Sequence, residues 1–329
     1  MKVLITGASG FLGGALARAL LKEGHAVRGF ARSPMAALAG LGAEVMCGDL
    51  ADADAVSRAV EGVEFVHHVG AKAGVWGPMA EYRRANVDGT RHVLDACRTH
   101  GAAGLVYTSS PSVVHAGADI RGADESLPYA THFETAYPET KAEAERLVLA
   151  ANSPAFATLA LRPHLIWGPG DNQLVPRLVS RARAGRLVLP GGGEAMIDST
   201  YIDSAVEAHV LAQGRLKPGA PCAGKAYFIS QGEVMKLRAL VDAIIGTAGL
   251  PPVTRTVPAG VALALGAVLE RVWGMVGAAR EPPLTRFVVR QMTTDHYFDL
   301  TAARRELGYG PRTSIREGIE LLRAANARA

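Results

Sequence analysis

Tyr137 and Lys141 are the residues whose types and spacing point most clearly to chemistry. They stand four apart in the segment YPETK, so both side chains would lie on one face of a helix. A phenol has an ordinary pKa of about 10, and a nearby ammonium favours its ionised form, so Lys141 is expected to lower the pKa of Tyr137. Lys141 can also bond a ribose hydroxyl. The pair predicts proton transfer to a bound ligand, although YxxxK alone is a common pattern.

Two polar residues strengthen this prediction. Ser110, in VYTSSP, follows a predicted strand, and the ligands of an open α/β sheet bind outside the carboxyl ends of its strands. We expect Ser110 to donate to a substrate carbonyl oxygen beside Tyr137, although a simple turn serine would also fit. Asn86, in ANVDGT, lies on the helix before that strand, where its amide could hold a water or bridge backbone groups.

The N-terminal segment VLITGASGFLG has the pattern of a phosphate-binding loop. A predicted strand leads into three glycines at three-residue spacing and then into a helix. Such glycines allow a sharp turn, close approach of backbone to a pyrophosphate, and close packing of the helix on the strand. The helix N-terminus adds free N–H groups and a positive dipole end. The predicted phosphate-binding residues are Gly7, Ser9, Gly10, Phe11, Leu12 and Gly13.

The end of the second predicted strand, VRGFARS, bears on the choice of coenzyme. NAD sites usually place an acidic residue ~20 residues beyond the glycines, where it bonds the ribose 2′-hydroxyl. Here Ala31 holds that position and Arg32 follows it. Arg32 can hold a 2′-phosphate through charge-assisted bonds, whereas Arg28 is expected to lie on the strand. The sequence predicts NADP(H), with a solvated surface arginine as the alternative for Arg32.

Residues after later strands extend the predicted coenzyme site. Asp49 could accept from the adenine amino group, Leu50 could pack on the ring, and Lys72 could reach a phosphate. His67 and His68 are expected to be packing or solvated residues, because no partner stands at metal-ligand spacing. No metal site is therefore predicted.

Short apolar runs alternate with helical patterns through the first half of the chain. Strands are expected at residues 3–6, 25–31, 44–47, 65–69, 105–108 and 158–162, and helices at 11–21, 52–60, 81–100 and 140–151. This order is typical of an α/β fold, a Rossmann-type doubly wound parallel sheet. Residues 1–165 would form the dinucleotide-binding domain. Residues 166–329, with helices expected at 174–184 and 204–213, would form mainly a smaller substrate-binding region, with some strands returning to the sheet.

The composition excludes several classes of protein. The net charge is only +4 and the basic residues are dispersed, so nucleic acid is not an expected partner. The chain has three cysteines, Cys47, Cys97 and Cys222, which lie far apart in the sequence. This number and spacing indicate neither a disulfide framework nor a zinc site, and they fit a cytoplasmic location. No signal peptide is expected, and no apolar run approaches the ~20 residues that span a bilayer.

The segment at residues 257–276 is unusually apolar. Its beginning, VPAGVALALGAVL, carries no charge before Glu270 and Arg271. It is too short to span a membrane, so three interpretations stand: a buried helix, a helix in a membrane interface, or a wall or lid of an apolar substrate tunnel. Arginines also follow the WGPGD loop, at positions 177, 181, 183 and 186. One of them could clamp a carboxylate, although solvated helix positions explain most of them.

Six segments resemble the extended short-chain dehydrogenases/reductases. TGASGFLG, DL, ANVDGT, YTSS, YPETK and LRPHLIWGPGD occur in that family's order and cover nearly the whole chain. Within this superfamily the chain looks like the 3β-hydroxysteroid dehydrogenase branch. Further details, AKAGVWG, TSSPSVV, LRPHLIWGPGDNQLVPRL, DSTYID, AGKAYFISQGE and PPLTRF, are similar to the bacterial 2-alkyl-3-oxoalkanoate reductases of long-chain olefin biosynthesis. GASGFLG departs from the commoner GGxGFxG, with residues that should fit the loop.

This resemblance implies a reaction and a role for each residue. Tyr137 would protonate a 3-oxo oxygen as NADPH delivers hydride to its carbon, Lys141 would lower the pKa of Tyr137 and hold the ribose, and Ser110 would bond the carbonyl oxygen. Pro163 and His164 would set backbone against the nicotinamide carboxamide. The product would be a 2-alkyl-3-hydroxyalkanoic acid, the substrate of a β-lactone-forming ligase. Homodimers are common in the family, and assembly with the other olefin-pathway enzymes is a further implication.

Three other functions share parts of this pattern. A 3β-hydroxysteroid or sterol dehydrogenase would favour oxidation in the cell, and the lack of an acid near Ala31 speaks against NAD-driven oxidation. Nucleotide-sugar epimerases usually recycle NAD and are disfavoured for the same reason. The last alternative is an NADP-sensing protein without turnover, which the complete set of Ser110, Tyr137 and Lys141 argues against.

Overall fold

The computed structural model describes residues 1–278 and 280–328, and its centre is a seven-stranded sheet. The strand order is β3-β2-β1-β4-β5-β7-β12, and every neighbouring pair is parallel. The strands are β1 Lys2–Thr6, β2 Ala26–Ala31, β3 Glu44–Cys47, β4 Phe65–His68, β5 Gly104–Thr108, β7 Ala157–Pro163 and β12 Ala226–Ile229. The predicted Rossmann-type, doubly wound parallel sheet is confirmed.

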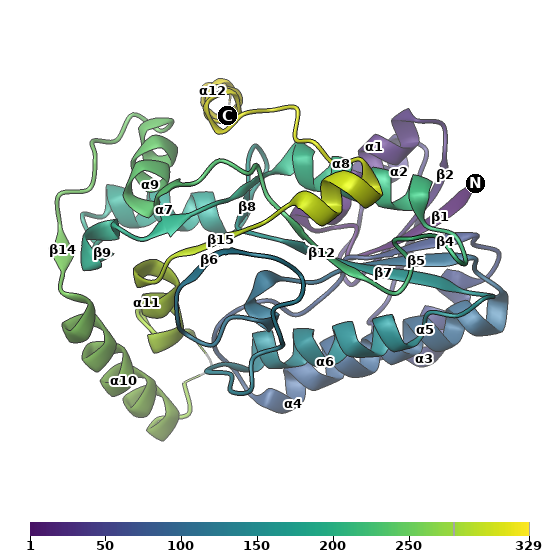
Figure 1. Cartoon of the computed structure of the whole chain (residues 1–329), viewed down its shortest axis with the longest axis horizontal. Helices are drawn as coiled ribbons and strands as arrows, with labels where there is room; N and C mark the ends of the chain where they lie inside the picture. The colour runs from purple at the N-terminus through teal and green to yellow at the C-terminus, as the bar shows by residue number, and fades with distance from the viewer. Residues whose placement is uncertain (279, 329) are drawn as a thin grey trace.

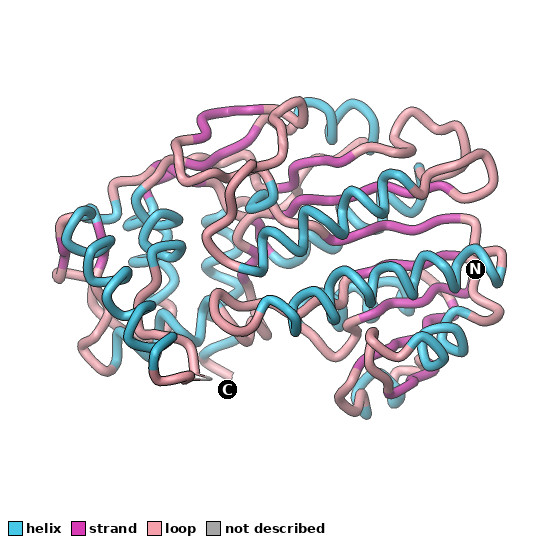
Figure 2. The backbone as a smooth tube through the Cα atoms, turned by 90° about the horizontal axis from the view of Figure 1, so that it is seen from below, coloured by secondary structure: helices cyan, strands magenta, loops and turns pink. Residues whose placement is uncertain are grey.

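Helices cover both faces of this sheet (Figure 1). α1 (Phe11–Lys22) and α8 (Ile202–Arg215) pack together on one face. α3 (Ala53–Val60), α5 (Gly89–His100) and α6 (Ala136–Ala150) cover the other face, and Figure 2 shows long helices running alongside the strands.

Burial explains both layers. In β1 the consecutive residues Val3, Leu4 and Ile5 have no exposed surface, because a parallel strand between two helical layers is apolar on both sides. Val3 and Ile5 join one hydrophobic core and Leu4 joins the other. In α1, Leu12 and Leu16 recur at helical spacing and are buried against the sheet.

The second half of the chain builds a separate group of helices at the left of Figures 1 and 2. These are α7 Leu174–Arg183, α9 Leu237–Gly246, α10 Ala259–Met275 and α11 Arg286–Thr293. β12 returns to the main sheet beside β7. A second sheet has the order β13-β10-β15-β6, formed by Met235–Lys236, Met196–Ile197, His296–Phe298 and Ile120–Ala123.

The remaining elements are short or peripheral. They are α2 Ala36–Gly40, α4 Met79–Tyr82, α12 Ile315–Asn326, and the strand pairs β8 Ile166–Trp167 with β11 Thr200–Tyr201 and β9 Leu189–Pro190 with β14 Thr256–Val257. Among the described helices, none combines the length and apolar character that crossing a bilayer requires.

Two helix boundaries differ from the prediction in ways that matter for the site. The helix expected at 81–100 is interrupted by a π-helical segment, Arg83–Asp88, between α4 and α5. Such segments are frequent at functional sites, and this one carries Asn86. α6 begins at Ala136, four residues before the predicted start, so Tyr137 lies in its first turn.

Candidate active site

A cavity of about 1170 Å³ runs along the carboxyl ends of the central strands. Residues that follow β1, β2, β3, β4, β5 and β7 all line it. The strand order reverses between β1 and β4, and the crevice at such a reversal is where open α/β sheets bind ligands. The cavity therefore lies where the prediction places the coenzyme and the reacting groups.

The glycine loop between β1 and α1 has the shape that a pyrophosphate requires. Gly7 has a φ of +70°, and a Cβ there would lie only 2.7 Å from the Gly70 Cα. A Cβ on Gly13 would overlap the Gly7 carbonyl. The first turn of α1 contains no acidic residue, and its N–H groups have no partner within the helix. The predicted phosphate-binding residues Gly7, Ser9, Gly10, Phe11, Leu12 and Gly13 all line the cavity, so this loop fits a dinucleotide.

Charged side chains gather at the end of the cavity where the sequence predicts the adenosine. Arg32 follows β2 and is exposed, while Ala31 before it is buried. Asp49 follows β3; its carboxylate accepts from the Ala51 N–H at 3.0 Å and pairs with the Arg84 guanidinium at 3.2 Å. These contacts lower the pKa of Asp49, the bond from Ala51 most strongly. The cavity lining includes Arg32, Asp49, Leu50 and Arg84, and Arg84 is a residue that sequence reasoning missed.

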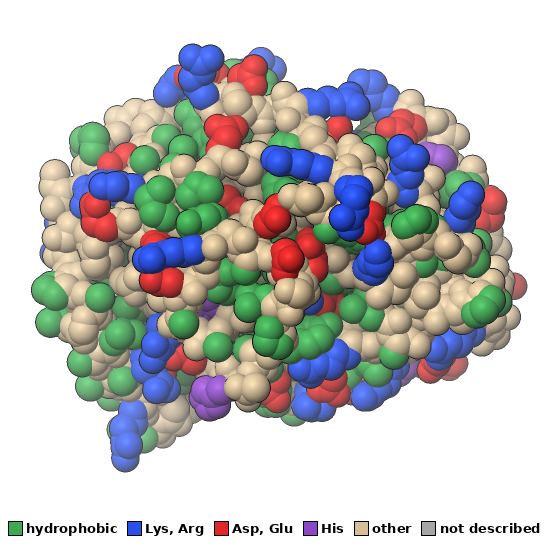
Figure 3. Space-filling model, in the orientation of Figure 1, with side chains coloured by type: hydrophobic (Ala, Val, Ile, Leu, Met, Phe, Trp, Pro, Cys, Tyr) green, Lys and Arg blue, Asp and Glu red, His purple; other side chains and the backbone are tan. Residues whose placement is uncertain are grey.

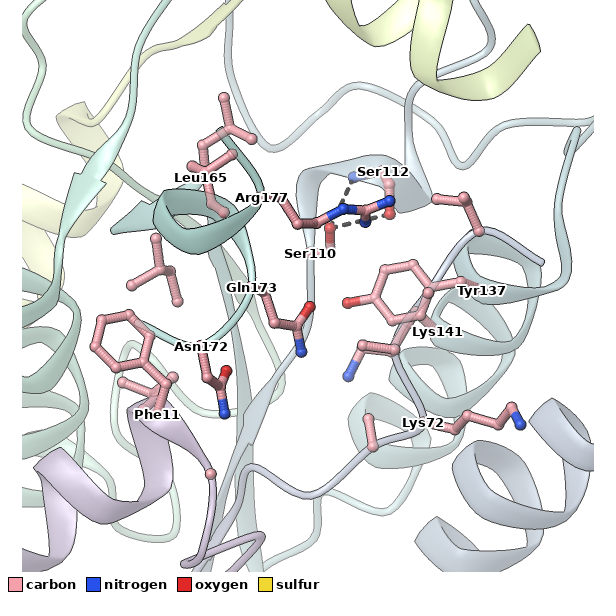
Figure 4. Close-up of a pocket in the computed structure, with 18 of the residues that line it drawn as sticks. Phe11, Lys72, Ser110, Ser112, Tyr137, Lys141, Leu165, Asn172, Gln173 and Arg177 are labelled. Atoms are coloured by element: carbon pink, nitrogen blue, oxygen red, sulfur yellow. Dashed lines mark hydrogen bonds between the residues drawn. The ribbon is translucent and has the colours of Figure 1, made fainter. Parts of the chain in front are cut away.

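Two other basic residues, Arg28 and Lys72, bond to groups of the protein itself. Arg28 lies on β2 as expected, and its Nη1 donates to the Ala59 and Glu61 carbonyls at 2.7 and 2.8 Å. Lys72 lines the cavity, but its Nζ lies 2.5 Å from Glu81 Oε2, and Figure 4 shows the ammonium directed away from the centre of the site. This geometry departs from the predicted contact between Lys72 and a coenzyme phosphate, because Glu81 already neutralises the ammonium.

Asn86 bridges backbone rather than standing free. Its Oδ1 accepts from the Lys72 N–H at 2.7 Å, and its Nδ2 donates to the Lys72 carbonyl at 3.1 Å and to Thr140 Oγ1 at 3.0 Å. Of the two roles considered for Asn86, the geometry favours the bridge. It fixes the loop after β4 against α6, which carries the candidate acid.

Ser110, Tyr137 and Lys141 line the same cavity. In Figure 4 the Tyr137 hydroxyl and the Lys141 amine both project into the space beside Ser110. Lys141 is only 2% exposed; its Nζ donates to the Thr108 carbonyl at 2.5 Å and lies 4.1 Å from the centre of the Tyr107 ring. The end of β5 therefore anchors the lysine of α6.

Burial sets the pKa values of this pair. It raises the pKa of Tyr137 to about 12, against the effect of the Ser110 hydrogen bond, and it lowers the pKa of Lys141 to about 7, against the Glu145 charge. The structure does not show the predicted lowering of the Tyr137 pKa by Lys141: burial raises that pKa, and only the Ser110 hydrogen bond acts against it. Tyr137 is consequently protonated at neutral pH and can act as a proton donor.

A second serine orients Ser110. The Oγ of Ser110 accepts from the Ser112 N–H at 3.2 Å and lies 2.9 Å from the Ser112 hydroxyl. When the Ser112 hydroxyl donates as well, the Ser110 proton is left for the cavity. Ser112 also lines the cavity, and sequence reasoning missed it although it stands in the same segment.

The end of β7 is held by a buried carboxylate. His164 Nδ1 lies 2.6 Å from Asp198 Oδ1, and the other Asp198 oxygen accepts from the Ser230 hydroxyl at 2.7 Å. The next residue, Leu165, has a φ of +42°, a strained value for a side chain with a Cβ, of the kind that concentrates at functional sites. Pro163, His164 and Leu165 all line the cavity.

A buried ion pair ties α6 to β7. The Arg162 guanidinium lies 2.6 Å from one Glu145 oxygen and 3.1 Å from the other, and both side chains are almost fully buried. The Tyr129 hydroxyl donates to the same carboxylate at 2.8 Å. This pair fixes the helix that carries Tyr137 and Lys141, and no motif identified it.

Helices α7, α9 and α11 supply most of the apolar cavity wall beyond the sheet. Its apolar residues include Leu174, Leu178, Leu237, Leu240, Val241, Ile244, Phe287, Val288 and Met292. Arg177 and Arg181 also line the cavity; the first pairs with Glu281 at 2.5 Å and the second donates to the Pro283 carbonyl at 3.1 Å. These two arginines fasten α7 to the segment before α11.

The structure of residues 257–276 contradicts two of the three interpretations of this apolar segment. None of them lines the cavity, so the predicted tunnel wall or lid is wrong. Within α10 only Ala262 and Gly266 are buried, so the buried helix is wrong as well. The apolar cavity wall comes instead mainly from α7, α9 and α11, and no motif pointed to α9 or α11.

His67 and His68 are core residues, as expected. His67 Nε2 lies 2.7 Å from Gln213 Oε1, while His68 contacts the Thr6 and Thr90 hydroxyls at 2.8 and 2.9 Å. Burial lowers the pKa of each histidine to about 3. No group of metal-ligating side chains occurs in the described part of the chain.

Comparison with known proteins identifies close relatives. Residues 4–258 match the model of the 3-beta hydroxysteroid dehydrogenase/isomerase family. The chain is 51% identical to a 2-alkyl-3-oxoalkanoate reductase of Stenotrophomonas maltophilia, over 99% of this chain and all of that protein. The corresponding protein of Shewanella oneidensis is 44% identical, over 98% of this chain and 85% of its own length. A 3 beta-hydroxysteroid dehydrogenase/Delta 5-->4-isomerase of Mycobacterium tuberculosis is 35% identical, over 97% and 88%.

Solved structures share the fold. The crystal structure of gox2253 superposes with a TM-score of 0.80 at 27% identity, covering 99% of this chain and 98% of its own. The Thermus thermophilus UDP-glucose 4-epimerase in complex with NAD superposes with a TM-score of 0.77 at 21% identity, covering each chain completely. At that identity the similarity shows the fold alone. The comparisons and the glycine loop together support a nicotinamide dinucleotide coenzyme.

Proposed function

Because this chain belongs to the 3-beta hydroxysteroid dehydrogenase/isomerase family, we propose that it reduces a 2-alkyl-3-oxoalkanoic acid to the 2-alkyl-3-hydroxyalkanoic acid with NADPH. The observation that carries this proposal is a phenol that burial keeps protonated, beside a serine hydroxyl, in a cavity whose far wall is apolar. The relatives of 51% and 44% identity bear the name of this activity, whereas the steroid dehydrogenase is more distant.

Tyr137 and Ser110 would share the work at the carbonyl oxygen. Ser110, oriented by Ser112, donates to the oxygen and polarises the carbon. Tyr137 gives its proton to the oxygen as negative charge develops there, and its pKa of about 12 means that the proton is present at the start of each turnover. Two donors aimed at one developing oxyanion stabilise the transition state more than the ground state.

The coenzyme would lie between the glycine loop and the end of β7. When bound, NADPH supplies the hydride that the carbonyl carbon accepts. The first turn of α1 would hold the pyrophosphate, and Lys141 would donate to the ribose when charged. Arg32 would bind the 2′-phosphate, with Arg84 adding positive charge beside Asp49. Each Asp49 oxygen has one partner and can accept a second hydrogen bond, so Asp49 would accept from the adenine amino group while Leu50 packs on the ring.

The apolar walls favour a substrate with hydrocarbon chains. α7, α9 and α11 line the cavity beyond Ser110 with aliphatic and aromatic side chains. Burying each methylene of an alkyl chain there contributes about 0.8 kcal/mol, so affinity should rise with chain length until the wall is filled. A rigid steroid would meet the same apolar surface, so the shape of the preferred substrate has to be measured.

The test is a substrate and coenzyme panel. Purified protein is mixed with NADPH or NADH and with 2-alkyl-3-oxo acids of increasing chain length, 3-ketosteroids and a UDP-hexose, and the absorbance of the reduced coenzyme is followed. We expect turnover with the oxo acids, a higher kcat/KM for longer chains and for NADPH, and slower or no reaction with the ketosteroids. Preferential turnover of ketosteroids, or coenzyme binding without turnover of any compound, would overturn the proposal.

A further inference from the structure

The face of α7 that lines the cavity carries apolar and charged side chains together. The residues of this helix that line the cavity are Leu174, Arg177, Leu178 and Arg181. The two leucines are four residues apart, and so are the two arginines, here called the arginine pair, so all four side chains share one side of the helix. This side of α7 matches an amphiphile that has an anionic head and hydrocarbon chains.

The two guanidinium groups of the arginine pair share one carboxylate. Arg177 Nη2 lies 2.5 Å from Glu281 Oε1, and the other nitrogens of this guanidinium have no hydrogen-bond partner among the described residues. Arg181 donates to the Pro283 carbonyl at 3.1 Å and pairs with no carboxylate in the part of the chain that the structure describes. A second anion at this place would therefore balance the two positive charges.

This excess of positive charge is local to the cavity. Figure 3 shows basic and acidic side chains interspersed over the face of the molecule drawn there. Inside the cavity, the Asp171 carboxylate accepts from the N–H groups of residues 173–175 at 2.8 to 3.3 Å, so its charge serves the N-terminus of α7. Burial lowers the pKa of Arg181, and the Arg177 charge lowers it further, against the effect of Glu281. An anionic ligand would relieve this repulsion.

The arginine pair lies at the reacting end of the cavity. Figure 4 shows the Arg177 side chain projecting from α7 into the cavity, on the side that Ser110 lines. Burial, and after it the Glu281 charge, raise the pKa of Tyr82, while burial, and after it Tyr82, raise the pKa of Tyr137. In a 3-oxo acid the carboxyl carbon is only two bonds from the carbonyl carbon. A group that binds this carboxylate must therefore lie close to the groups that bind the ketone oxygen.

We propose that Arg177 binds the carboxylate of the substrate, and that Arg181 supplies the second positive charge that lets this carboxylate and Glu281 share the site. The remaining donors of the Arg177 guanidinium can hold a carboxylate through charge-assisted bonds. Arg181 is about 6 Å further along the helix, at 1.5 Å per residue, where its charge offsets the repulsion between two carboxylates. The inference rests on the proposed reductase activity and adds to it the residues that select an acid over a neutral ketone such as a steroid.

A purely structural role is the alternative for these two side chains. Both join α7 to residues 281–283, so their loss would loosen the cavity wall if they served only as fasteners. A loosened wall would impair the reduction of every ketone, whereas loss of a carboxylate ligand would impair the reduction of acids alone. The methyl ester of the same 2-alkyl-3-oxo acid separates these cases, because it keeps the ketone and both chains but lacks the charge.

The experiment compares the acid and its methyl ester as substrates with NADPH. Wild type should give a kcat/KM for the acid about tenfold above that for the ester, or more. Arg177→Met should lower the kcat/KM for the acid about tenfold, mainly through KM, and leave the ester within about twofold, and Arg181→Met should act in the same direction. Glu281→Gln should lower the KM for the acid, because a competing carboxylate is removed. Arg183→Met, at an exposed arginine of α7 outside the cavity lining, is the matched control and should behave like wild type.

A binding measurement separates this proposal from the reductase activity. Calorimetric titration of a 2-alkyl-3-hydroxy acid and of its methyl ester, with NADP⁺ present, should show the same preference for the acid and its loss in Arg177→Met. If neither oxo compound is reduced but the hydroxy acid binds preferentially, the reductase activity fails and the carboxylate site stands. Equal rates for acid and ester in wild type, equal losses of both in Arg177→Met, or tighter binding of UDP than of the hydroxy acid would overturn the carboxylate site.

Discussion

The two ends of the cavity use charge in opposite ways. At the reacting end Lys141 is buried, its amine bonds a backbone carbonyl, and desolvation shifts both its pKa and that of Tyr137. At the adenosine end Arg32 and Arg84 are exposed, and Arg84 meets Asp49 in a pair open to solvent. Burial thus sets protonation at the end proposed for proton transfer, while the proposed choice of coenzyme would depend on exposed charges that water and salt screen.

Removing the phenol should produce the largest effect. Tyr137→Phe keeps the ring and the packing of α6 but removes the proton that the carbonyl oxygen must receive. We expect kcat to fall by about 10³-fold or more, because loss of a general acid typically costs about 10²–10⁴-fold. The Kd for NADPH should change little. Single-turnover rates and fluorescence titration of the coenzyme measure the two quantities.

The control is Tyr297→Phe, a tyrosine outside the cavity lining, which should retain wild-type kcat. If Tyr137→Phe kept more than about a tenth of the activity, the reacting end would not depend on its buried phenol. The proposed contrast between buried charges at one end of the cavity and exposed charges at the other would then be contradicted.

Breaking the buried ion pair between Arg162 and Glu145 should test, through the stability of the fold, the contrast between buried and exposed charges. Arg162→Met leaves the Glu145 carboxylate buried with the Tyr129 hydroxyl as its remaining side-chain partner. An uncompensated buried charge of this kind costs about 3–5 kcal/mol, and we expect the free energy of unfolding in urea to fall by that amount.

An exposed pair provides the comparison. Arg98 lies 3.2 Å from Asp95 on α5, with both side chains more than half exposed. Arg98→Ala should change the free energy of unfolding by less than about 1 kcal/mol. Equal losses for the two variants would show that burial does not separate these interactions.

The sequence predicted the local geometry of the site better than its surroundings. Tyr137 and Lys141 share a helical face, and the glycine loop leads into a helix, because these relations depend on residues a few positions apart. Arg84 comes to the cavity, and Glu145 pairs with Arg162 between α6 and β7, through tertiary packing that no short motif encodes. The fold followed from alternating apolar patterns, whereas the π-helical segment around Asn86 depends on contacts with a distant loop.

The same limit explains the errors. A reference pKa and a four-residue spacing suggested that Lys141 would acidify Tyr137, but the depth of burial is a property of the folded chain. The apolar run at 257–276 predicted an apolar environment, and only the packing of Ala262 and Gly266 on α11 determined which face would remain outside.

The pH dependence of coenzyme capture should sharpen the contrast. With a pKa of about 7, Lys141 is charged below that pH and neutral above it, so its bond to an anionic, hydroxyl-rich ligand weakens as the pH rises. We expect kcat/KM for NADPH, which reports groups of the free enzyme, to fall by up to about tenfold per unit above pH 7. Steady-state rates between pH 5 and 9, at saturating oxo acid, measure this profile.

Lys141→Arg is the informative variant, because a guanidinium stays charged throughout this range. Its profile should lack the decrease near pH 7, whatever its absolute rate. A wild-type profile that stays flat from pH 6 to 9 would mean that Lys141 keeps its charge when buried. The pKa assigned to the reacting end would then be refuted.

Removing the exposed arginine should have the smallest effect. Arg32→Ala loses charge-assisted bonds to a 2′-phosphate, which contribute about 1.5–3 kcal/mol each before screening, so we expect the Kd for NADPH to rise about tenfold. NADH lacks that phosphate, so its Kd should change less than about twofold. Raising the salt concentration should narrow the difference between the two coenzymes, because the guanidinium is exposed. Arg98→Ala controls for the loss of one positive charge, and an equal loss of both coenzymes in Arg32→Ala would assign the preference to Arg84 or to the loop backbone instead.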